Sequence, residues 1–480
     1  MSLSVVENND AWLPSALNSQ WEDDDCEEYI DEQDIITSNA RTARRLNTSI
    51  SLGGTGSMSA SIDDPTEIMF PPVRFEVFSR RYKTNVVSIH DADLVTPSWR
   101  RIGLDVVNAD SAGVHNLLKQ PLCGFPNTSL QLKGDSNRSG SVILRVEMRE
   151  FITSVSALGM VPKYGVIKLS QYKINSQGKG RFTQTTSPLS AADPANTEAS
   201  MLRAFRKLVL RNITPCIPLL YTYTIVDWKT VAEGRHHLFA DWFAALRKDV
   251  PLAREECMCM FMEYVKGGSL RSAVRKQPLH TNQWRVVLFQ VFFCLAVLDD
   301  AYMYRHNDLH MANIALHFRK VQKGQITKYR FKNTEYYVPN MGIEARLMDF
   351  DWSVAQGFPN GKIRYALEKC MSVATPEDPN VFDTHRLLLV IYMYAGTPLP
   401  IRHWIRSMYH PISPHLLSDK NNKHLHDYRL LRTSSLLSQM PTPVDVLNSS
   451  LFSGFKTSDP LKSVVPPEFV YEGRSSVLDV

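Results

Sequence analysis

The chain of 480 residues is too long for one average domain, and its content of 44% hydrophobic and 10% aromatic residues is enough to bury a sizeable core. The formal net charge of +5 hides an asymmetry along the chain. Residues 1–40 contain eleven Asp and Glu residues and no Lys or Arg, so the other 440 residues carry 54 basic against 38 acidic residues, a net charge of +16. An acidic segment therefore precedes a basic body.

Cysteine usage and hydropathy limit the setting in which the protein works. The seven cysteines are odd in number and lack paired spacing, which argues against a disulfide framework or a zinc site and favours a reducing, intracellular compartment. The N-terminus lacks the basic and then apolar layout of a signal peptide. The longest apolar stretch, 284–298, is too short to span a bilayer. We expect no membrane segment.

The first 125 residues differ in composition from the rest. Residues 1–66 combine the acidic run with Ser, Gly, Thr and Asn and show no sustained period of 2 or 3.6, which predicts a disordered, solvated tail. A tail that docks a partner or regulates the protein is the alternative. Residues 67–125 contain strand-like pieces broken by polar stretches, and we interpret them as an N-terminal extension packed on the main domain.

From about residue 126 the pattern changes to strands and then to long helical periods. Alternating or apolar runs predict strands at 129–134, 141–148 and 164–170. The apolar positions of 284–298 recur at helical spacing and predict a long helix. Strands followed by helices favour a two-lobed α+β chain.

Polar residues follow this helix in a way that suggests chemistry. The segment 305–314 places Asp308 and Asn313 five residues apart, so one loop can bring a proton acceptor and an amide oxygen to the same phosphate. Farther on, the short apolar strand at 346–348 ends at Asp349, and a carboxylate at a strand end is a typical ligand position for Mg²⁺.

A possible partner pair lies upstream. The apolar strand at 165–167 ends at Lys168, which is either a surface lysine or a phosphate anchor. Asp193 and Pro194 open a helix as an N-cap and a first-turn proline. Glu198 lies on the apolar stripe of this helix, and because a buried carboxylate needs a partner, Lys168 is the obvious one.

Taken in chain order, these residues resemble the eukaryotic-type protein kinase signature. That signature consists of a strand lysine, a helix glutamate, a loop aspartate followed by an asparagine, and a strand-end aspartate. The resemblance implies a bilobal fold, with a small β-rich N-lobe that contains one key helix and a larger helical C-lobe. It also implies ATP and Mg²⁺ as cofactors. The roles it implies are Lys168 on the α- and β-phosphates, Glu198 orienting that lysine, Asn313 and Asp349 on the metal, and Asp308 accepting the proton of the attacking hydroxyl.

Other segments extend the resemblance. Residues 260–270 look like the hinge between kinase lobes, which makes Met262 the gatekeeper and turns the backbones of Glu263 and Val265 towards adenine. Asp383 begins a segment that looks like the central C-lobe helix, whose first aspartate holds the catalytic-loop backbone. Residues 440–452 resemble the closing helices of that lobe. The implied boundaries are an N-lobe at 126–262, the hinge and C-lobe at 263–455, and a C-terminal tail at 456–480.

Several features depart from the kinase pattern. The glycine loop offers only Gly134 and Gly140, six residues apart, for the approach of backbone N–H groups to phosphates. Asn307 replaces the arginine that receives an activation-loop phosphate in regulated kinases, which argues against this form of switching. Asp351 replaces the glycine of the strand-end motif and restricts the backbone there.

His310 and the insert 317–345 bear on the acceptor of the phosphate. His310 replaces the lysine of Ser/Thr kinases, a form similar to haspin-like kinases, to kinases of large DNA viruses and to small-molecule phosphotransferases. The insert 317–345 looks like the hairpin of the viral and haspin-like kinases and favours a Ser/Thr protein kinase. A small-molecule kinase of the aminoglycoside or choline type and a pseudokinase scaffold remain alternatives. The basic residues are dispersed, so we expect no direct nucleic-acid binding; the oligomeric state stays open.

Overall fold

The computed structural model describes a set of segments, all within one of the two compact units into which the chain divides. The described segments are 129–130, 141–147, 164–172, 193–231, 256–318, 325–368, 372–412 and 437–456, with 470–473 and a few single positions at 114, 116, 118, 119 and 417. The predictions for residues 1–66, for nearly all of 67–125, and for Gly134 and Gly140 lie outside them.

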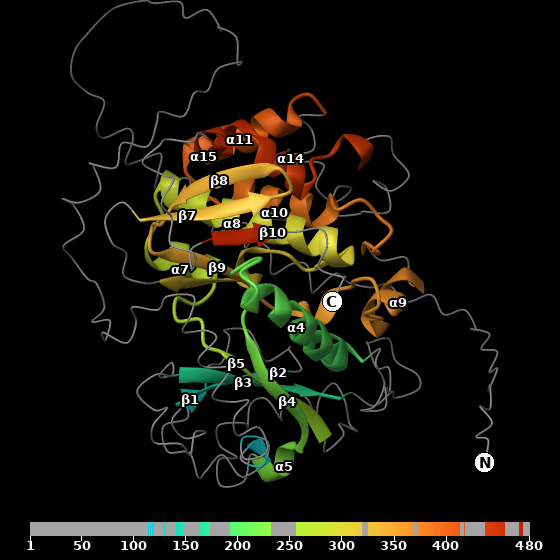
Figure 1. Cartoon of the computed structure of the whole chain (residues 1–480). Coiled ribbons are helices and arrows are strands. Elements are labelled where there is room, and N and C mark those ends of the chain that lie inside the picture. Colours follow the sequence, from blue (N-terminus) through green and yellow to red (C-terminus); the bar gives the residue numbers. More distant parts are fainter. Residues whose placement is uncertain are drawn as a thin grey trace, which may run out of the picture. The chain divides into compact units, whose positions relative to one another are not determined.

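The larger sheet consists of five described strands, which are β1 (Ser129–Leu130), β2 (Ser141–Glu147), β3 (Tyr164–Gln171), β4 (Leu220–Asp227) and β5 (Glu256–Glu263). Their order is β1-β2-β3-β5-β4, and all neighbours are antiparallel (Figure 1). Lys168 in β3 lies opposite Ile143 of β2 and Met260 of β5. Because residues directly opposite in a sheet share a face, these three side chains project together. The strands expected at 141–148 and 164–170 are confirmed.

Helix α4 (Pro194–Leu210) carries the predicted glutamate. It begins as expected, because the Asp193 carboxylate accepts the N–H of Ala195 and a proline occupies the first turn. Glu198 is buried on the same face as Met201 and Phe205. Thr197, next to it, donates its hydroxyl to the Pro359 carbonyl at 2.7 Å. The helix therefore buries its apolar stripe and a single carboxylate together.

A long buried helix supports the polar loop. Helix α8 (Thr281–Tyr302) is buried along almost its whole length, as its apolar period predicts, and ends at Met303 in the left-handed conformation. After the loop, β6 (Ile314–Phe318) pairs antiparallel with β9 (Ile343–Leu347). This pairing sets Ile314 opposite Leu347, and Met348 donates its N–H to the Asn313 carbonyl at 2.8 Å. The start of one strand and the end of the other thus hold the two candidate metal ligands close together.

A second sheet packs against α8. It contains β7 (Ile326–Phe331), β8 (Thr334–Pro339) and the late strand β10 (Val470–Gly473), in the order β10-β7-β8 (Figure 1). The hairpin expected within 317–345 is therefore present. Phe289 of α8 packs edge-on against Tyr329 at 5.1 Å between ring centres, and Tyr471 stacks on Tyr329 at 5.3 Å. Aromatic packing holds this sheet, and β10 adds an element that the sequence pattern did not indicate.

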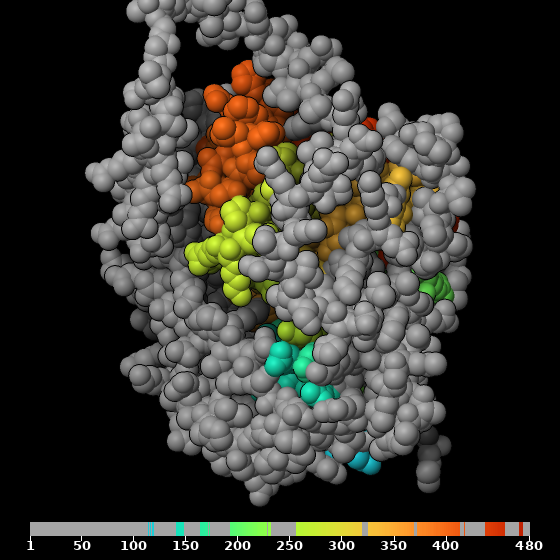
Figure 2. All heavy atoms as spheres, turned by 90° about the vertical axis from the view of Figure 1, so that its left-hand side faces the viewer, coloured from blue at the N-terminus to red at the C-terminus, as the bar shows by residue number. Residues whose placement is uncertain are grey.

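The remaining described elements are mostly helices. They are α5 (Trp228–Val231), α7 (Leu270–Lys276), η8 (Met311–Asn313), η9 (Phe350–Trp352), α9 (Gly361–Glu368), α10 (Phe382–Met393), α11 (Leu399–Tyr409), η12 (Leu437–Gln439), α14 (Pro443–Asn448), η13 (Ser450–Phe452) and α15 (Ser453–Lys456). The described part is thus a mixed α+β structure. On the face in Figure 2, teal atoms from the β2–β3 part lie beside yellow-green atoms of the chain that follows residue 256. None of the helices described here is long and apolar enough to cross a membrane.

Candidate functional site

A buried cluster of opposite charges joins three segments of the chain. Lys168 Nζ donates to both carboxylate oxygens of Glu198 at 2.8 Å and to Asp349 Oδ1 at 2.9 Å. The side chains of Lys168 and Glu198 are 7% and 3% exposed, whereas that of Asp349 is 26% exposed and can still meet a ligand. The pairing of Lys168 with Glu198 that the sequence predicted is confirmed. We call these three residues the buried charge cluster.

The lysine of the buried charge cluster keeps its proton. Burial alone would lower the pKa of Lys168, but the negative charges of Asp349 and Glu198 outweigh it and hold the pKa above its usual value. Burying ions is costly unless they are paired with good geometry, and the short contacts of this cluster provide that geometry. The Lys168 ammonium group therefore stays positively charged beside the partly exposed carboxylate of Asp349.

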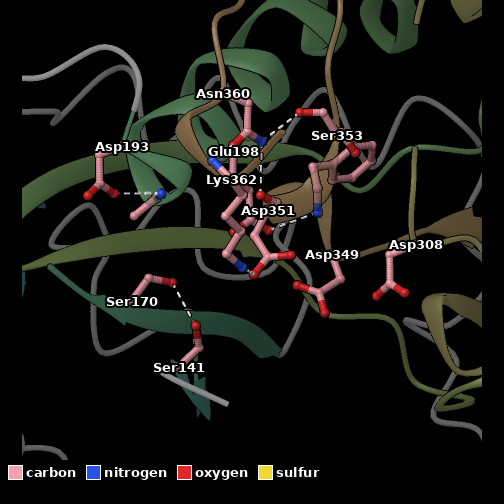
Figure 3. Close-up of polar contacts among 12 residues, drawn as sticks. Ser141, Ser170, Asp193, Glu198, Asp308, Asp349, Asp351, Ser353, Asn360 and Lys362 are labelled. Carbon is pink, nitrogen blue, oxygen red and sulfur yellow. Dashed lines mark hydrogen bonds and ion pairs between the residues drawn. The ribbon is translucent and has the colours of Figure 1, made fainter. Parts of the chain in front are cut away.

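Asp308 lies in a polar loop and receives a donor on each oxygen. Asn313 Nδ2 donates to Asp308 Oδ2 at 2.9 Å and to its backbone carbonyl at 2.8 Å. Arg386 donates to Asp308 Oδ1 at 3.0 Å. Burial raises the pKa of Asp308 above its ordinary value, the positive charge of Arg386 opposes this shift, and Asp349 adds to it. Figure 3 shows Asp308 and Asp349 with their carboxylates directed to the same side of the site.

The backbone before Asp308 is held by α10. The carboxylate of Asp383 accepts the N–H groups of His306 at 2.6 Å and Asn307 at 2.9 Å, and its side chain is fully buried. The expectation that this aspartate holds the loop backbone is confirmed. Asn307 itself has a left-handed backbone with φ of 62°, which non-glycine residues adopt only when their surroundings stabilise it.

The side chain of Asn307 ties the loop to a later segment. Its Nδ2 donates to the Ala374 carbonyl at 2.9 Å, and its Oδ1 accepts the Ala374 N–H at 2.7 Å. The neutral side-chain amide thus forms the same pair of hydrogen bonds with Ala374 that a neighbouring β-strand backbone would form. Because these contacts need no added phosphate, the segment around Ala374 is held to the loop in the unmodified chain.

The residues after Asp349 are also anchored. Asp349 has a φ of 64°, a second strained position in the site. Phe350 is buried, and its N–H donates to Glu198 Oε1 at 3.4 Å. Asp351 forms an ion pair with Lys362 of α9, and Asn360 donates to the Asp351 carbonyl at 3.0 Å (Figure 3). The residue that replaces the kinase glycine therefore links the strand-end motif to α9.

The expected hinge begins in the last residues of β5 and continues beyond the strand. Met262 is buried and lies opposite Val166 in the sheet, on the face that carries Lys168. Glu263 donates its backbone N–H to the Leu219 carbonyl at 2.8 Å, and its carboxylate accepts the Leu219 N–H at 3.0 Å. Val265 is also buried. The assignment of Met262 as gatekeeper and of the Glu263 and Val265 backbones to adenine stays a prediction.

The oxygen atoms near Asp349 and Asn313 suit a magnesium ion. Because the amide nitrogen of Asn313 donates to Asp308, its oxygen is the atom left to serve as a ligand. Magnesium prefers oxygen ligands and often takes only one or two from the protein when the substrate supplies phosphates. No group of three or more His, Cys, Asp or Glu side chains suited to a metal occurs among the described residues. The Asp349 carboxylate and the Asn313 amide oxygen are thus two oxygen ligands of the kind that magnesium takes.

Two charged residues of the site were not singled out from the sequence. Arg386 follows Asp383 by one helical turn, and residues three apart share a helix face, so the role of Asp383 could have pointed to it. Lys362 had no comparable signal, because its partner Asp351 is eleven residues away across a loop.

Comparisons with known proteins agree with the kinase resemblance. No protein-family model matches the chain. The mimivirus protein named "Putative serine/threonine-protein kinase R400", from Acanthamoeba polyphaga mimivirus, is 25% identical over 187 residues, which cover 36% of this chain and 40% of that protein. From the same virus, "Putative serine/threonine-protein kinase R301" is 34% identical over 70 residues, 14% of this chain and 18% of that protein. The chain thus spans less than half of either relative, and it has a kinase-like relationship to both.

Proposed function

We propose that the protein is a Ser/Thr protein kinase that uses ATP and Mg²⁺. One observation carries the proposal: Lys168 bridges Glu198 and Asp349, while Asp308 lies beside them with Asn313. Residues from β3, α4, the polar loop and the end of β9 thus converge on one place, in the order that kinases require. The relationship to viral proteins named as kinases supports the same reaction class.

In the proposed reaction each residue has a separate task. Lys168 holds the α- and β-phosphates, and Glu198 orients its ammonium group. Asn313 and Asp349 would hold magnesium, which when bound offsets the negative charge of the phosphates. Asp308 orients the acceptor hydroxyl and takes its proton. The acceptor oxygen bonds to the γ-phosphorus as the bond from that phosphorus to the β-phosphate oxygen breaks, and ADP leaves.

The nucleotide would lie between the larger sheet and the helical part, as in a bilobal kinase. We place the N-lobe at 126–262 and the C-lobe at 263–455, with the adenine against Met262 and the backbones of Glu263 and Val265. The tail at 1–66 and the extension at 67–125 are additions to this catalytic unit, whereas the tail at 456–480 returns through β10 to pair with β7. Gly134 and Gly140 would approach the phosphates.

We propose a protein acceptor in an intracellular compartment, the host cytoplasm or nucleus if the chain is viral. The hairpin of β7 and β8 supports the likeness to viral and haspin-like kinases. The described residues contain no disulfide, and their cysteines Cys216, Cys257, Cys259 and Cys294 are buried, which suits reducing conditions.

Transfer from γ-labelled ATP tests the proposal. The wild-type chain should label a generic basic or acidic protein substrate in the presence of Mg²⁺, and Asp308→Asn should reduce the rate by roughly 10²–10⁴-fold because the base is lost. Mg²⁺–ATP should raise the melting temperature of both proteins by mass action. Labelling of a small-molecule panel instead of protein would favour the small-molecule kinase. Nucleotide binding without any transfer by the wild type would indicate a pseudokinase.

A further inference from the structure

Arg386 makes two contacts with the polar loop from outside it. On α10, one turn after Asp383, its Nη1 donates to the Asn307 carbonyl at 2.8 Å and its Nη2 to Asp308 Oδ1 at 3.0 Å. The two donors of one planar guanidinium therefore hold the backbone just before Asp308 and the carboxylate itself. The side chains of Arg386 and Asp308 are 24% and 26% exposed, so the pair opens to the site.

This arrangement sets the direction of the carboxylate. Asn313 holds Oδ2, and Arg386 holds Oδ1, so rotation of the carboxylate would break a contact on either side. A carboxylate has about four acceptor sites. With one donor on each oxygen, Asp308 keeps acceptor sites for a hydroxyl group while its plane is held.

The described residues of the loop supply the neutral amide of Asn313 but no charged donor within hydrogen-bond distance of Asp308. His310 Nε2 lies 3.7 Å from Asp308 Oδ2, beyond hydrogen-bond distance, and its Nδ1 accepts the N–H of Ala312 at 3.1 Å. The histidine is thus oriented towards its own backbone. Arg386 is the residue that brings a permanent positive charge into hydrogen-bond contact with Asp308.

We propose that Arg386 is a positioning residue for phosphoryl transfer, which aims the carboxylate of Asp308 at the acceptor hydroxyl. The inference rests on the proposed kinase function and extends it to a residue on a different element. A partly exposed ion pair contributes little to stability. Misplacing a reacting group by about 1 Å, by contrast, can reduce a rate by about 100-fold. Removal of Arg386 should therefore affect kcat far more than folding or ATP binding.

The test compares Arg386→Met, Arg386→Lys and Arg386→Ala with the wild type in the labelled-ATP assay. We expect Arg386→Met to reduce kcat by about 100-fold with the KM for ATP within about twofold. Arg386→Lys should recover part of this loss, because lysine keeps one charged donor but not the fork. Added methylguanidine should raise the rate of Arg386→Ala, an effect that a purely structural role would not produce. The matched control is Arg330→Met, which removes an arginine from an ion pair on β7 and should leave kcat unchanged.

The outcomes distinguish failure of the proposed role of Arg386 from failure of the proposed kinase function. If the wild type transfers no phosphate, the kinase proposal fails and the role of Arg386 fails with it. If the wild type is active and Arg386→Met has the same kcat, only the role of Arg386 is overturned. A variant that melts far below the wild type, or whose melting temperature no longer rises with Mg²⁺–ATP, would show that Arg386 is structural and would also overturn the inference.

Discussion

The buried charge cluster of Lys168, Glu198 and Asp349 and the charged face of the second sheet use the same kinds of ion pair in opposite surroundings. In the cluster, the side chains of Lys168 and Glu198 are almost inaccessible to water. On the sheet, Glu335 is contacted by Arg330 at 2.7 Å and Lys328 at 2.9 Å, with side chains 35%, 41% and 19% exposed. Distances alone do not distinguish the two sites.

Burial is the difference that matters. Water screens the charges of Glu335 and its partners, so each pair adds little free energy and can be lost at small cost. Around Lys168 and Glu198, which are almost inaccessible to water, no solvent replaces a lost partner, so each of these two charges depends on its partners in the cluster. A costly arrangement of this kind is retained where charge must be held ready for a ligand, as we propose for the nucleotide phosphates.

Removal of the buried cation should have the largest effect. Lys168→Met leaves Glu198 buried without its partner, and we expect it to reduce the free energy of unfolding by about 3–5 kcal/mol. Phosphate transfer should fall by roughly 100-fold or more. Urea unfolding and the labelled-ATP assay measure the two effects.

A double variant separates the loss of stability from the loss of phosphate transfer. Lys168→Met combined with Glu198→Leu removes both charges of the pair and should regain most of the lost stability, while phosphate transfer stays as low as in the single variant. If the single variant were as stable as the wild type, or if the double variant regained phosphate transfer, the comparison between buried and exposed pairs would fail.

Substitution of Asp383, which holds the backbone of the polar loop, should have the next largest effect. Asp383→Asn keeps one acceptor oxygen, so it satisfies only one of the two N–H groups of His306 and Asn307. We expect a loss of about 1–3 kcal/mol in unfolding free energy and a clear fall in kcat. Asp445→Asn is a matched control, because Asp445 accepts the Thr442 N–H at an exposed helix start. It should cost at most about 1 kcal/mol and leave kcat unchanged, and an equal fall in kcat would contradict this explanation.

Substitution of Asn307 should have a smaller effect on stability and on kcat, confined to the contact with Ala374. Asn307→Gly keeps the left-handed backbone without strain and removes only the two contacts with Ala374. We expect the segment around Ala374 to lose about 1–2 kcal/mol of local stability, and kcat to fall by roughly tenfold. Phosphatase treatment should not change the wild-type rate, because these contacts need no phosphate. Loss of activity on such treatment would show that a modification, rather than Asn307, holds this segment.

Local patterns predicted the elements better than the contacts between them. The N-cap at Asp193, the buried stripe with Glu198 and the apolar period of α8 are each contained in one short stretch, so the sequence alone indicated them. Arg386 and Lys362 act across the chain on partners in other elements, and spacing holds little information about such pairs. Strand β10 was missed for the same reason, since its partner β7 lies about 140 residues earlier and a four-residue strand has almost no period of its own.

Loss of the exposed ion pairs of Glu335 on the second sheet should change the free energy of unfolding least. This change should also depend on pH. Hydrogen bonds from Lys328, Tyr337 and Arg330 lower the pKa of Glu335 from 4.5 to about 2. Because the folded pKa is the lower one, the stabilisation is present above pH 4.5 and is lost as the pH falls towards 2. Since the side chain is 35% exposed, Glu335→Gln should cost less than about 1 kcal/mol at pH 7. Urea unfolding should show this difference shrinking in acid and in high salt, with phosphate transfer unchanged. A difference that persisted at pH near 2 would mean that packing, not charge, makes Glu335 stabilising.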